Sequence, residues 1–280
     1  MKTAIILFQC EDQKGIVAKI SNFILEKDGN IIDADQHSTN PINGHFFIRI
    51  EFCFDEKNHA EAIMEQEFEL IASEFNADWK IYYKNKKNRM GILVSKPDHC
   101  LFNILYRWKS GEFNVEIPFV ISNCPEHKSL VKQFGIKFYY IKATKEDKKE
   151  KEILKIISDK TDFLVLARYM QILSPEFLNS YNKDIINIHH SFLPCFKGAA
   201  PYSQAFEKGV KVVGATAHYV TANLDEGPII EQMVEKISHK DTVDALKEKG
   251  KNLENMAIAK AIQYYTEHRV IKYQNKTIVF

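Results

Sequence analysis

IINIHHSFLPCFKGAAPYSQAFEKGVKVVGATAHYVTANLDEGPIIE, residues 185–231, is the stretch around which the rest of the chain is organised. It opens with an Ile-rich strand that carries an amide, Asn187, and an imidazole, His189. Strand side chains alternate between faces, so these two point the same way. They precede a Phe-Leu-Pro break, and ligands of open α/β sheets bind beyond the carboxyl ends of strands. The pair is either an oxyanion-stabilising set or a strand-ending amide beside a core histidine.

The second half of this stretch adds a third imidazole and a carboxylate. Residues 212–220 predict another buried strand, with His218 near its end, followed by a polar loop at 221–228. Asp225 in that loop is a turn former before Gly-Pro, or the general base that an Asn/His site lacks. The added carboxylate favours a catalytic interpretation.

The same stretch excludes two other kinds of chemistry. It holds no nucleophilic Ser or Cys in an elbow motif and no metal-ligand spacing. His189 and His190 are adjacent, so on a strand they are expected to face opposite sides, which is poor geometry for one metal ion. We therefore expect attack of water or an amine on an acyl carbon, without covalent or metal catalysis.

The composition indicates a two-domain protein. A chain of 280 residues exceeds the usual size of one core. Its formal charge of +1 gives no sign of a nucleic-acid or membrane partner. The five cysteines are odd in number, scattered and without a CxxC pair, which suits a reduced cytoplasm. We expect no signal peptide, and no apolar run reaches the ~18 residues of a membrane span.

The first domain, residues 1–84, is predicted to have the order βαββαβ. An apolar stripe between Gly15 and Gly29 predicts its first helix. The turn at 41–44 predicts a hairpin. The expected strands are 3–8, 30–37, 45–54 and 78–83, and the second helix is 58–75.

A charged linker at 85–89 leads to the second domain, residues 90–280. Short apolar strands alternate with helices here, which predicts a doubly wound, mostly parallel sheet in an α/β fold. Besides the two strands above, we expect strands at 90–94, 116–122, 137–141 and 163–167, helices at 101–108, 126–134, 145–160 and 242–268, and an edge strand from the tail 269–280.

The motif at 187–198, followed by Leu-Asp-Glu-Gly-Pro at 224–228, resembles the folate-dependent formyltransferase superfamily. The resemblance implies a formyltransferase-like sheet, with Asn187, His189 and Asp225 as the catalytic residues. His218 is expected to orient Asp225 or its water, and His190 to support the site. No metal and no cofactor are implied, because 10-formyltetrahydrofolate is the substrate.

Two turns are expected to hold the pterin ring of the folate. On spacing alone the apolar side chains at 170–173 are better explained as core. The resemblance instead implies that their backbone lines the pterin pocket and that the loop before Asp225 closes its other side. The expected substrate-binding residues are Met170, Gln171, Ile172, Leu173, Thr221, Ala222 and Asn223.

The loop at 95–100 decides between branches of the superfamily. Transferases that act on a phosphorylated acceptor carry a Gly/Ser-rich loop here, whose amides hold the phosphate. This chain has Lys-Pro-Asp-His instead: Pro97 removes a donor and Asp98 repels an anion. His190 stands where those transferases have Pro. The chain is thus most similar to the formyltetrahydrofolate deformylases, which use water as the acceptor.

The first domain resembles an ACT domain, a ferredoxin-like regulatory module. Residues 10–17 look like the first turn of that module, with Lys14 in place of the usual Pro. This implies a homo-oligomer, dimer or tetramer, and a small amino acid as candidate effector. A module that serves only oligomerisation is an equal alternative.

We expect hydrolysis of 10-formyltetrahydrofolate to formate and tetrahydrofolate, with water activated by Asp225 and the tetrahedral intermediate stabilised by Asn187 and His189. Two alternatives stay open. One is a formyltransferase to an amine acceptor. The other is a folate or amino-acid sensor without catalysis, against which the intact set of three residues argues.

Overall fold

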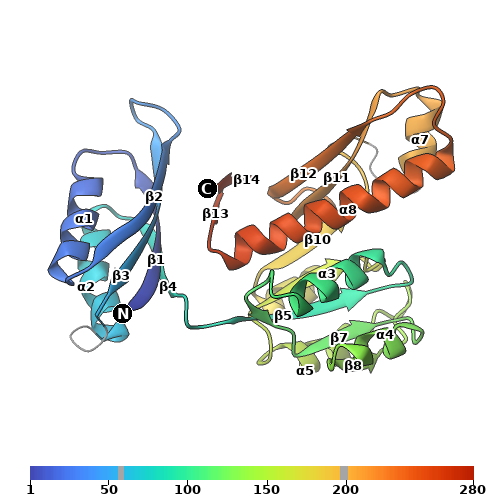
Figure 1. The fold of residues 1–280 in the computed structure, drawn as a ribbon, viewed down its shortest axis with the longest axis horizontal. Coiled ribbons are helices and arrows are strands. Elements are labelled where there is room, and N and C mark those ends of the chain that lie inside the picture. Colours follow the sequence, from blue (N-terminus) through green and yellow to red (C-terminus); the bar gives the residue numbers. More distant parts are fainter. Residues whose placement is uncertain (56–59, 196–200) are drawn as a thin grey trace. The chain divides into compact units, whose positions relative to one another are not determined.

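A computed structural model of the chain describes residues 1–55, 60–195 and 201–280, which form two compact units (Figure 1). One unit comprises residues 1–87 with 268–271 and 278–280, and the other residues 88–267 with 272–277. Residues 268–271 and 278–280 of the C-terminal tail thus belong to the first unit. The sequence instead predicts that the whole tail lies in the second domain, residues 90–280. No helix in the described part of the chain is long and apolar enough to cross a membrane.

The first unit has the predicted βαββαβ order. Its elements are β1 (Lys2–Glu11), α1 (Ile16–Glu26), β2 (Asn30–Ser38), β3 (His45–Phe54), α2 (Glu61–Glu74) and β4 (Asp78–Tyr83). The strands form an antiparallel sheet in the order β2-β3-β1-β4. Phe68 of α2 meets Phe8 of β1 and Phe23 of α1 edge-on, at centroid distances of 6.2 and 5.1 Å. This core gives the small unit a stable sheet of its own.

The second unit is built on the predicted doubly wound sheet. Its strands are β5 (Asn88–Val94), β6 (Val115–Glu116), β7 (Phe119–Ser122), β8 (Lys137–Tyr140), β9 (Phe163–Ala167), β10 (Ile185–His189), β11 (Val212–Tyr219) and β12 (Ile229–Lys236). They follow the order β12-β11-β10-β9-β5-β7-β8, with β6 paired to β5. The strands from β8 to β10 are parallel, and β11 and β12 are antiparallel to their neighbours.

Helices cover both faces of this sheet. They are α3 (His99–Lys109), α4 (His127–Gln133), α5 (Glu150–Ile157), α6 (Pro175–Tyr181), α7 (Pro201–Glu207) and α8 (Val243–Thr266). Adjacent residues of β9 face opposite layers: Leu164 packs in the core of α5 and α6, and the Phe163 ring lies 4.5 Å from that of Tyr265 on α8. Figure 1 shows α8 running along β10, β11 and β12.

Two predicted elements were too long. The strand expected at 116–122 divides into β6 and β7, because Pro118 between them has no N–H for the sheet. The helix expected at 145–160 begins only at Glu150. Lys149 has a left-handed backbone (φ 54°), and the Thr144 N–H closes a turn on the Asp147 carbonyl at 2.9 Å.

The tail does not form the predicted single edge strand. It forms β13 (Val270–Tyr273) and β14 (Lys276–Val279), which pair with each other across a turn at Gln274. Helices α6 and α7 and the full length of β12 were not predicted. For α6 a signal existed, since Ser174 caps it by accepting the Phe177 N–H (3.1 Å) and Pro175 follows at its first position.

Candidate active site

Strand β10 delivers Asn187 and His189 to the carboxyl end of the parallel strands. Its neighbour β11 places His218 directly opposite Asn187 in the antiparallel register. Thr216 fixes the turn after β10, because its hydroxyl donates to the Ser191 carbonyl (2.9 Å) and accepts the Leu193 N–H (3.1 Å). The Phe-Leu-Pro segment after His189 is thus a turn that Thr216 holds by hydrogen bonds, next to Asn187 and His189.

Asp225 reaches this site from the loop after β11. Its Oδ2 lies 3.2 Å from Nδ1 of His189, and both side chains are at least nine-tenths buried. The loop returns tightly to β11: the Tyr219 N–H donates to the Pro228 carbonyl at 2.9 Å. Gly227 permits this approach, because a Cβ there would lie 1.8 Å from the Tyr219 oxygen. The structure therefore brings together the three residues predicted to be catalytic.

His218 lies closer to Asn187 than it does to Asp225. Its Nδ1 lies 2.9 Å from the Tyr219 carbonyl, which can only accept, so Nδ1 carries the proton. Nε2 lies 3.2 Å from Nδ2 of Asn187 and 3.7 Å from Oδ1 of Asp225. Burial lowers the pKa of His218. A neutral His218 thus accepts a hydrogen bond from the Asn187 amide.

The charges in this site hold Asp225 ionised. Burial alone would raise the pKa of its carboxyl, but the hydrogen bond from His189 and the charge of that ring outweigh it and lower the pKa. On the other side of the ring, Nε2 of His189 is buried and has no hydrogen-bond partner among the residues described. A buried nitrogen without a partner is available to a ligand.

The expectation that His189 and His190 face opposite sides is wrong. Their ring centroids are 5.1 Å apart, because β10 ends at His189 and the backbone bends there. The ring of Tyr202 also contacts that of His190, at a centroid distance of 6.2 Å. Burial, and then the charge of Arg168, lowers the pKa of His190 to about 4. His190 is therefore a neutral imidazole next to the candidate catalytic one.

The turn at 170–173 divides between core and surface. Leu173 is buried in the core, whereas Met170 and Ile172 are 51% and 58% exposed. The core interpretation is therefore right for Leu173 and wrong for the other two. Gln171 Oε1 is buried without a hydrogen-bond partner in the part of the chain described. Exposed apolar side chains beside a buried polar atom are suited to contacting a ligand.

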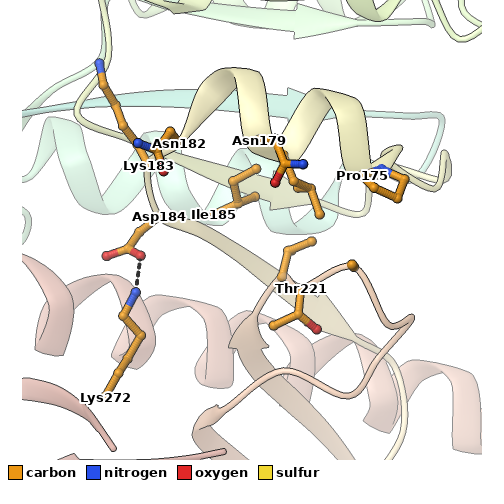
Figure 2. Close-up of a pocket in the computed structure, with 11 residues that line it drawn as sticks. Pro175, Asn179, Asn182, Lys183, Asp184, Ile185, Thr221 and Lys272 are labelled. Carbon is orange, nitrogen blue, oxygen red and sulfur yellow. Dashed lines mark hydrogen bonds and ion pairs between the residues drawn. The ribbon is translucent and has the colours of Figure 1, made fainter. Parts of the chain in front are cut away.

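Thr221, Ala222 and Asn223 are exposed in the loop before Asp225. The first two line a polar pocket of about 340 Å³ (Figure 2). Ile185, the first residue of β10, also lines this pocket, whereas the catalytic residues predicted at the other end of the strand do not. The pocket therefore lies at the opposite end of β10 from His189.

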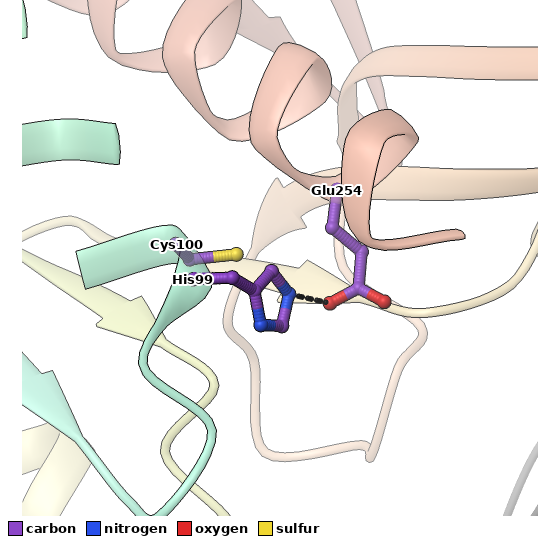
Figure 3. A group of neighbouring side chains, drawn as sticks. All are labelled: His99, Cys100 and Glu254. Carbon is purple, nitrogen blue, oxygen red and sulfur yellow. Dashed lines mark hydrogen bonds and ion pairs between the residues drawn. The ribbon is translucent and has the colours of Figure 1, made fainter. Parts of the chain in front are cut away.

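One buried polar cluster was missed in the sequence. Glu254, only 2% exposed, lies 2.8 Å from Nε2 of His99 (Figure 3). It also lies 3.3 Å from Nε of Arg168 and accepts the Tyr202 hydroxyl at 3.1 Å. These four side chains are far apart in sequence. The signal available was a charge at a position where α8 has an apolar stripe, formed by Leu246, Leu253, Ala257 and Ile258.

The same cluster has the spacing of a metal site. Ligand atoms of His99, Cys100 and Glu254 lie within 4.8 Å of one another. However, the Glu254 carboxylate already accepts from His99 and Tyr202, and the guanidinium of Arg168 stands beside it as a competing cation. Burial also raises the pKa of the Cys100 thiol well above its ordinary value, which disfavours the thiolate that a metal binds. These contacts fit a hydrogen-bonded network better than a metal centre.

Family models match both units. The formyl transferase model matches residues 88–262, and the ACT domain model matches residues 4–68. Over 281 residues the chain is 47% identical to formyltetrahydrofolate deformylase of Synechocystis, covering 99% of this chain and 98% of that one. It is 44% identical to the Bacillus subtilis protein of the same name, covering 98% and 93%.

Solved structures agree with these matches. A formyltetrahydrofolate deformylase from Pseudomonas syringae superposes with a TM-score of 0.94 at 40% identity, covering 100% of this chain and 95% of that one. A glycinamide ribonucleotide transformylase from Symbiobacterium toebii superposes with a TM-score of 0.66 at 28% identity, covering 71% and 97%. The likeness to the deformylase thus extends over the whole chain, and that to the transformylase over a part of it.

Proposed function

The chain belongs to the formyltetrahydrofolate deformylase family and hydrolyses 10-formyltetrahydrofolate to formate and tetrahydrofolate, and we propose that Asn187, His189 and Asp225 carry this reaction. The observation that carries the proposal is the pairing of His189 with Asp225. A carboxylate lies 3.2 Å from one nitrogen of the imidazole, and the other nitrogen is buried without a partner in the described residues. The end of β10 thus holds a carboxylate that can act as base, an imidazole that can act as acid, and an imidazole nitrogen that can donate to substrate.

The reaction begins with the Asp225 carboxylate, which takes a proton from water as the water oxygen bonds to the formyl carbon. Its lowered pKa keeps this carboxylate ionised at neutral pH. His189, as imidazolium, donates from Nδ1 to Asp225 and from Nε2 to the oxyanion that forms. When the carbon–nitrogen bond breaks, Nε2 gives its proton to the leaving nitrogen. Asp225 then releases its proton to solvent and Nε2 of His189 takes up another, which restores the pair.

Asn187 supplies a second donor to the oxyanion. Its amide has two N–H groups, and the one directed at His218 Nε2 fixes the plane of the amide. The other N–H is free to donate to the developing negative charge, where a donor fixed in advance stabilises the transition state. His218 thus acts on the reaction through Asn187.

The deciding experiment is formate release from 10-formyltetrahydrofolate with no acceptor added. Steady formate is expected from the wild type, and a fall of at least about 10²-fold from Asp225→Asn, which keeps the shape but cannot accept the proton. Asp78→Asn, an exposed residue of the first unit, is the matched control and should match the wild type. Equal rates in all three proteins would remove Asp225 from its role.

Two other outcomes separate the alternatives. A wild type that releases no formate in buffer but transfers the formyl group to an added amine is a formyltransferase. Tight folate binding with no turnover at all indicates a sensor. Either result overturns the hydrolytic assignment, because water is the acceptor in the proposal.

We propose further that residues 1–84 are an ACT-like regulatory and oligomerisation domain, joined by the linker 85–89 to a catalytic domain at 90–280. The match to the ACT model supports a small amino acid as effector. Strand β2 lies at the edge of its sheet and exposes Ile31 and Ile32, which supports association into a dimer or tetramer. Light scattering with and without each amino acid tests both points.

The folate serves as substrate, and we propose that no further cofactor takes part. A cytoplasmic location is proposed from the cysteines, all five of which are free. Dialysis against a chelator, followed by the formate assay, tests the cofactor proposal. Loss of activity that added metal restores would contradict it.

A further inference from the structure

Glu254 is a buried charge that the proposed chemistry does not use. It lies on the sheet-facing side of α8, and a buried carboxylate is costly unless it is paired and hydrogen-bonded. Its partners come from three other places in the fold: His99 from the start of α3, Arg168 from the turn after β9, and Tyr202 from α7. Burial would raise the pKa of Glu254, but His99 and Arg168 lower it. The carboxylate is therefore ionised and held from three sides.

Helix α8 has a glycine, Gly250, where it contacts Tyr202. A Cβ at Gly250, one turn before Glu254, would lie 1.9 Å from the hydroxyl oxygen of Tyr202 and 2.1 Å from its Cζ. A glycine inside a helix costs about 1 kcal/mol relative to alanine. Here the absent side chain makes room for the Tyr202 ring and brings its hydroxyl to Glu254.

Tyr202 in turn borders His190. The two rings meet edge to face at 6.2 Å, and His190 contacts the ring of His189 at 5.1 Å. Within the residues that the structure describes, His190 makes ring contacts with His189 and Tyr202 and no hydrogen bond. The imidazole is neutral near pH 7, since burial and Arg168 lower its pKa. A neutral imidazole offers one donor and one acceptor, the groups needed to hold a water molecule.

We propose that Glu254 is a positioning residue for the hydrolysis: through Tyr202 it fixes the ring of His190 against His189, and a nitrogen of His190 holds the water that attacks the formyl carbon. This inference rests on the proposed function, because it names the residues that supply the nucleophile. The water then gives its proton to Asp225, as described above. Glu254 itself touches neither the substrate nor the water.

A double-mutant cycle tests the proposal in the full-length protein. Glu254→Gln is expected to lower kcat about 10²-fold, the scale of a misplacement of ~1 Å at a reacting group, with little change in KM. His190→Ala should have a loss of similar size. In the double variant, kcat should be little lower than in either single variant, because Glu254 and His190 act on the same water. Losses that multiply would overturn the proposal, since Glu254 would then act elsewhere.

Gly250→Ala tests the same link without touching a charged group. Alanine favours the helix, but its Cβ displaces Tyr202, so kcat should fall while the protein stays folded. Tyr202→Phe keeps the ring and removes the hydroxyl that Glu254 accepts, and should give a smaller loss. Glu248→Gln, an exposed change on the same helix, is the matched control. Wild-type kcat in Gly250→Ala or in folded Glu254→Gln would refute the inference.

These results are distinguishable from failure of the proposed function. If the wild type releases no formate without an acceptor, the function itself is wrong. If the wild type is active and the cycle is additive, only the inference is wrong. The rival metal site has its own signature: one equivalent of zinc in the purified wild type that is lost in Glu254→Gln would make Glu254 a ligand and overturn the positioning role.

Discussion

Asn187 and His218 share a hydrogen bond of 3.2 Å across the junction of β10 and β11. The two strands are therefore joined at the site by side chains as well as by the backbone ladder. Because His218 uses its Nδ1 proton on the Tyr219 carbonyl, its Nε2 can only accept. The orientation of the Asn187 amide is thus decided by a backbone oxygen on the neighbouring strand.

Asn187→Ala should lower kcat by about 10²–10³-fold, the usual effect of losing one oxyanion donor. The change removes the amide and leaves His218 Nε2 without its partner. Formate release measured at saturating substrate gives kcat directly. Asn85→Ala, at an exposed position of the linker, is the control and should be fully active. A loss below tenfold would contradict the oxyanion role.

His218 should be in the neutral tautomer with its proton on Nδ1 at neutral pH. The reason is its 2.9 Å contact with the Tyr219 carbonyl, together with burial that lowers its pKa. Nitrogen-15 NMR of labelled histidine distinguishes this tautomer from the one protonated on Nε2. A proton found on Nε2 would mean that the Asn187 amide is turned the other way. The spectrum of His218→Gln assigns the signal.

The free energy of unfolding should fall in acid because of His190. Its pKa is about 4 in the folded chain, against an ordinary value of 6.5. Between these values the unfolded chain binds more protons, so stability is full at higher pH and is lost as pH falls below about 6.5. The loss from about pH 8 to about pH 5 amounts to ~2 kcal/mol for this group.

Urea unfolding at those two pH values measures the effect. His190→Gln should lose about 2 kcal/mol less than the wild type on acidification, because glutamine does not titrate. His239→Gln, at an exposed position, is the control and should keep the wild-type pH dependence. The same pH dependence in all three proteins would exclude a lowered pKa at His190.

Gly227→Ala should damage both stability and activity. Its Cβ would lie 1.8 Å from the Tyr219 oxygen, so the loop that carries Asp225 must move away from β11. We expect a loss of about 1–3 kcal/mol in stability and a fall in kcat of at least tenfold. Gly135→Ala is the control: its left-handed backbone is strained by the change, but no atom lies within 4 Å. That variant should lose some stability and no activity.

Ile172→Ser should raise KM and leave kcat unchanged. Ile172 is 58% exposed in the turn expected to line the pterin, and burying such a side chain against a ligand contributes about 1.5 kcal/mol or more. The corresponding rise in KM is about tenfold. Leu70→Ser, at an exposed apolar position of α2, should leave both constants unchanged. An unaltered KM in Ile172→Ser would remove this residue from the substrate site.

Prediction from sequence succeeded where the signal is local. The apolar stripe of α1 and the runs of β3, β4 and β9 are found at the expected positions, because periodicity of 3.6 or 2 reflects which face is buried. It failed where a single residue overrides the pattern: Pro118 divides a strand, and Lys149 delays a helix. The division of the strand and the late start of the helix depend on backbone conformation at these residues, which the pattern of apolar residues does not indicate.

The sequence by itself determined the alternation of strands and helices, the βαββαβ order of the first unit, and the candidates Asn187, His189 and Asp225. These follow from side-chain periodicity and from a motif that is nearly contiguous. Only the tertiary structure decided that His190 lies against His189 and that Glu254 meets His99 across 155 residues of chain. Contacts of this kind arise when separate elements pack together, and their energies depend on distance and burial in space, neither of which is a property of position along the chain.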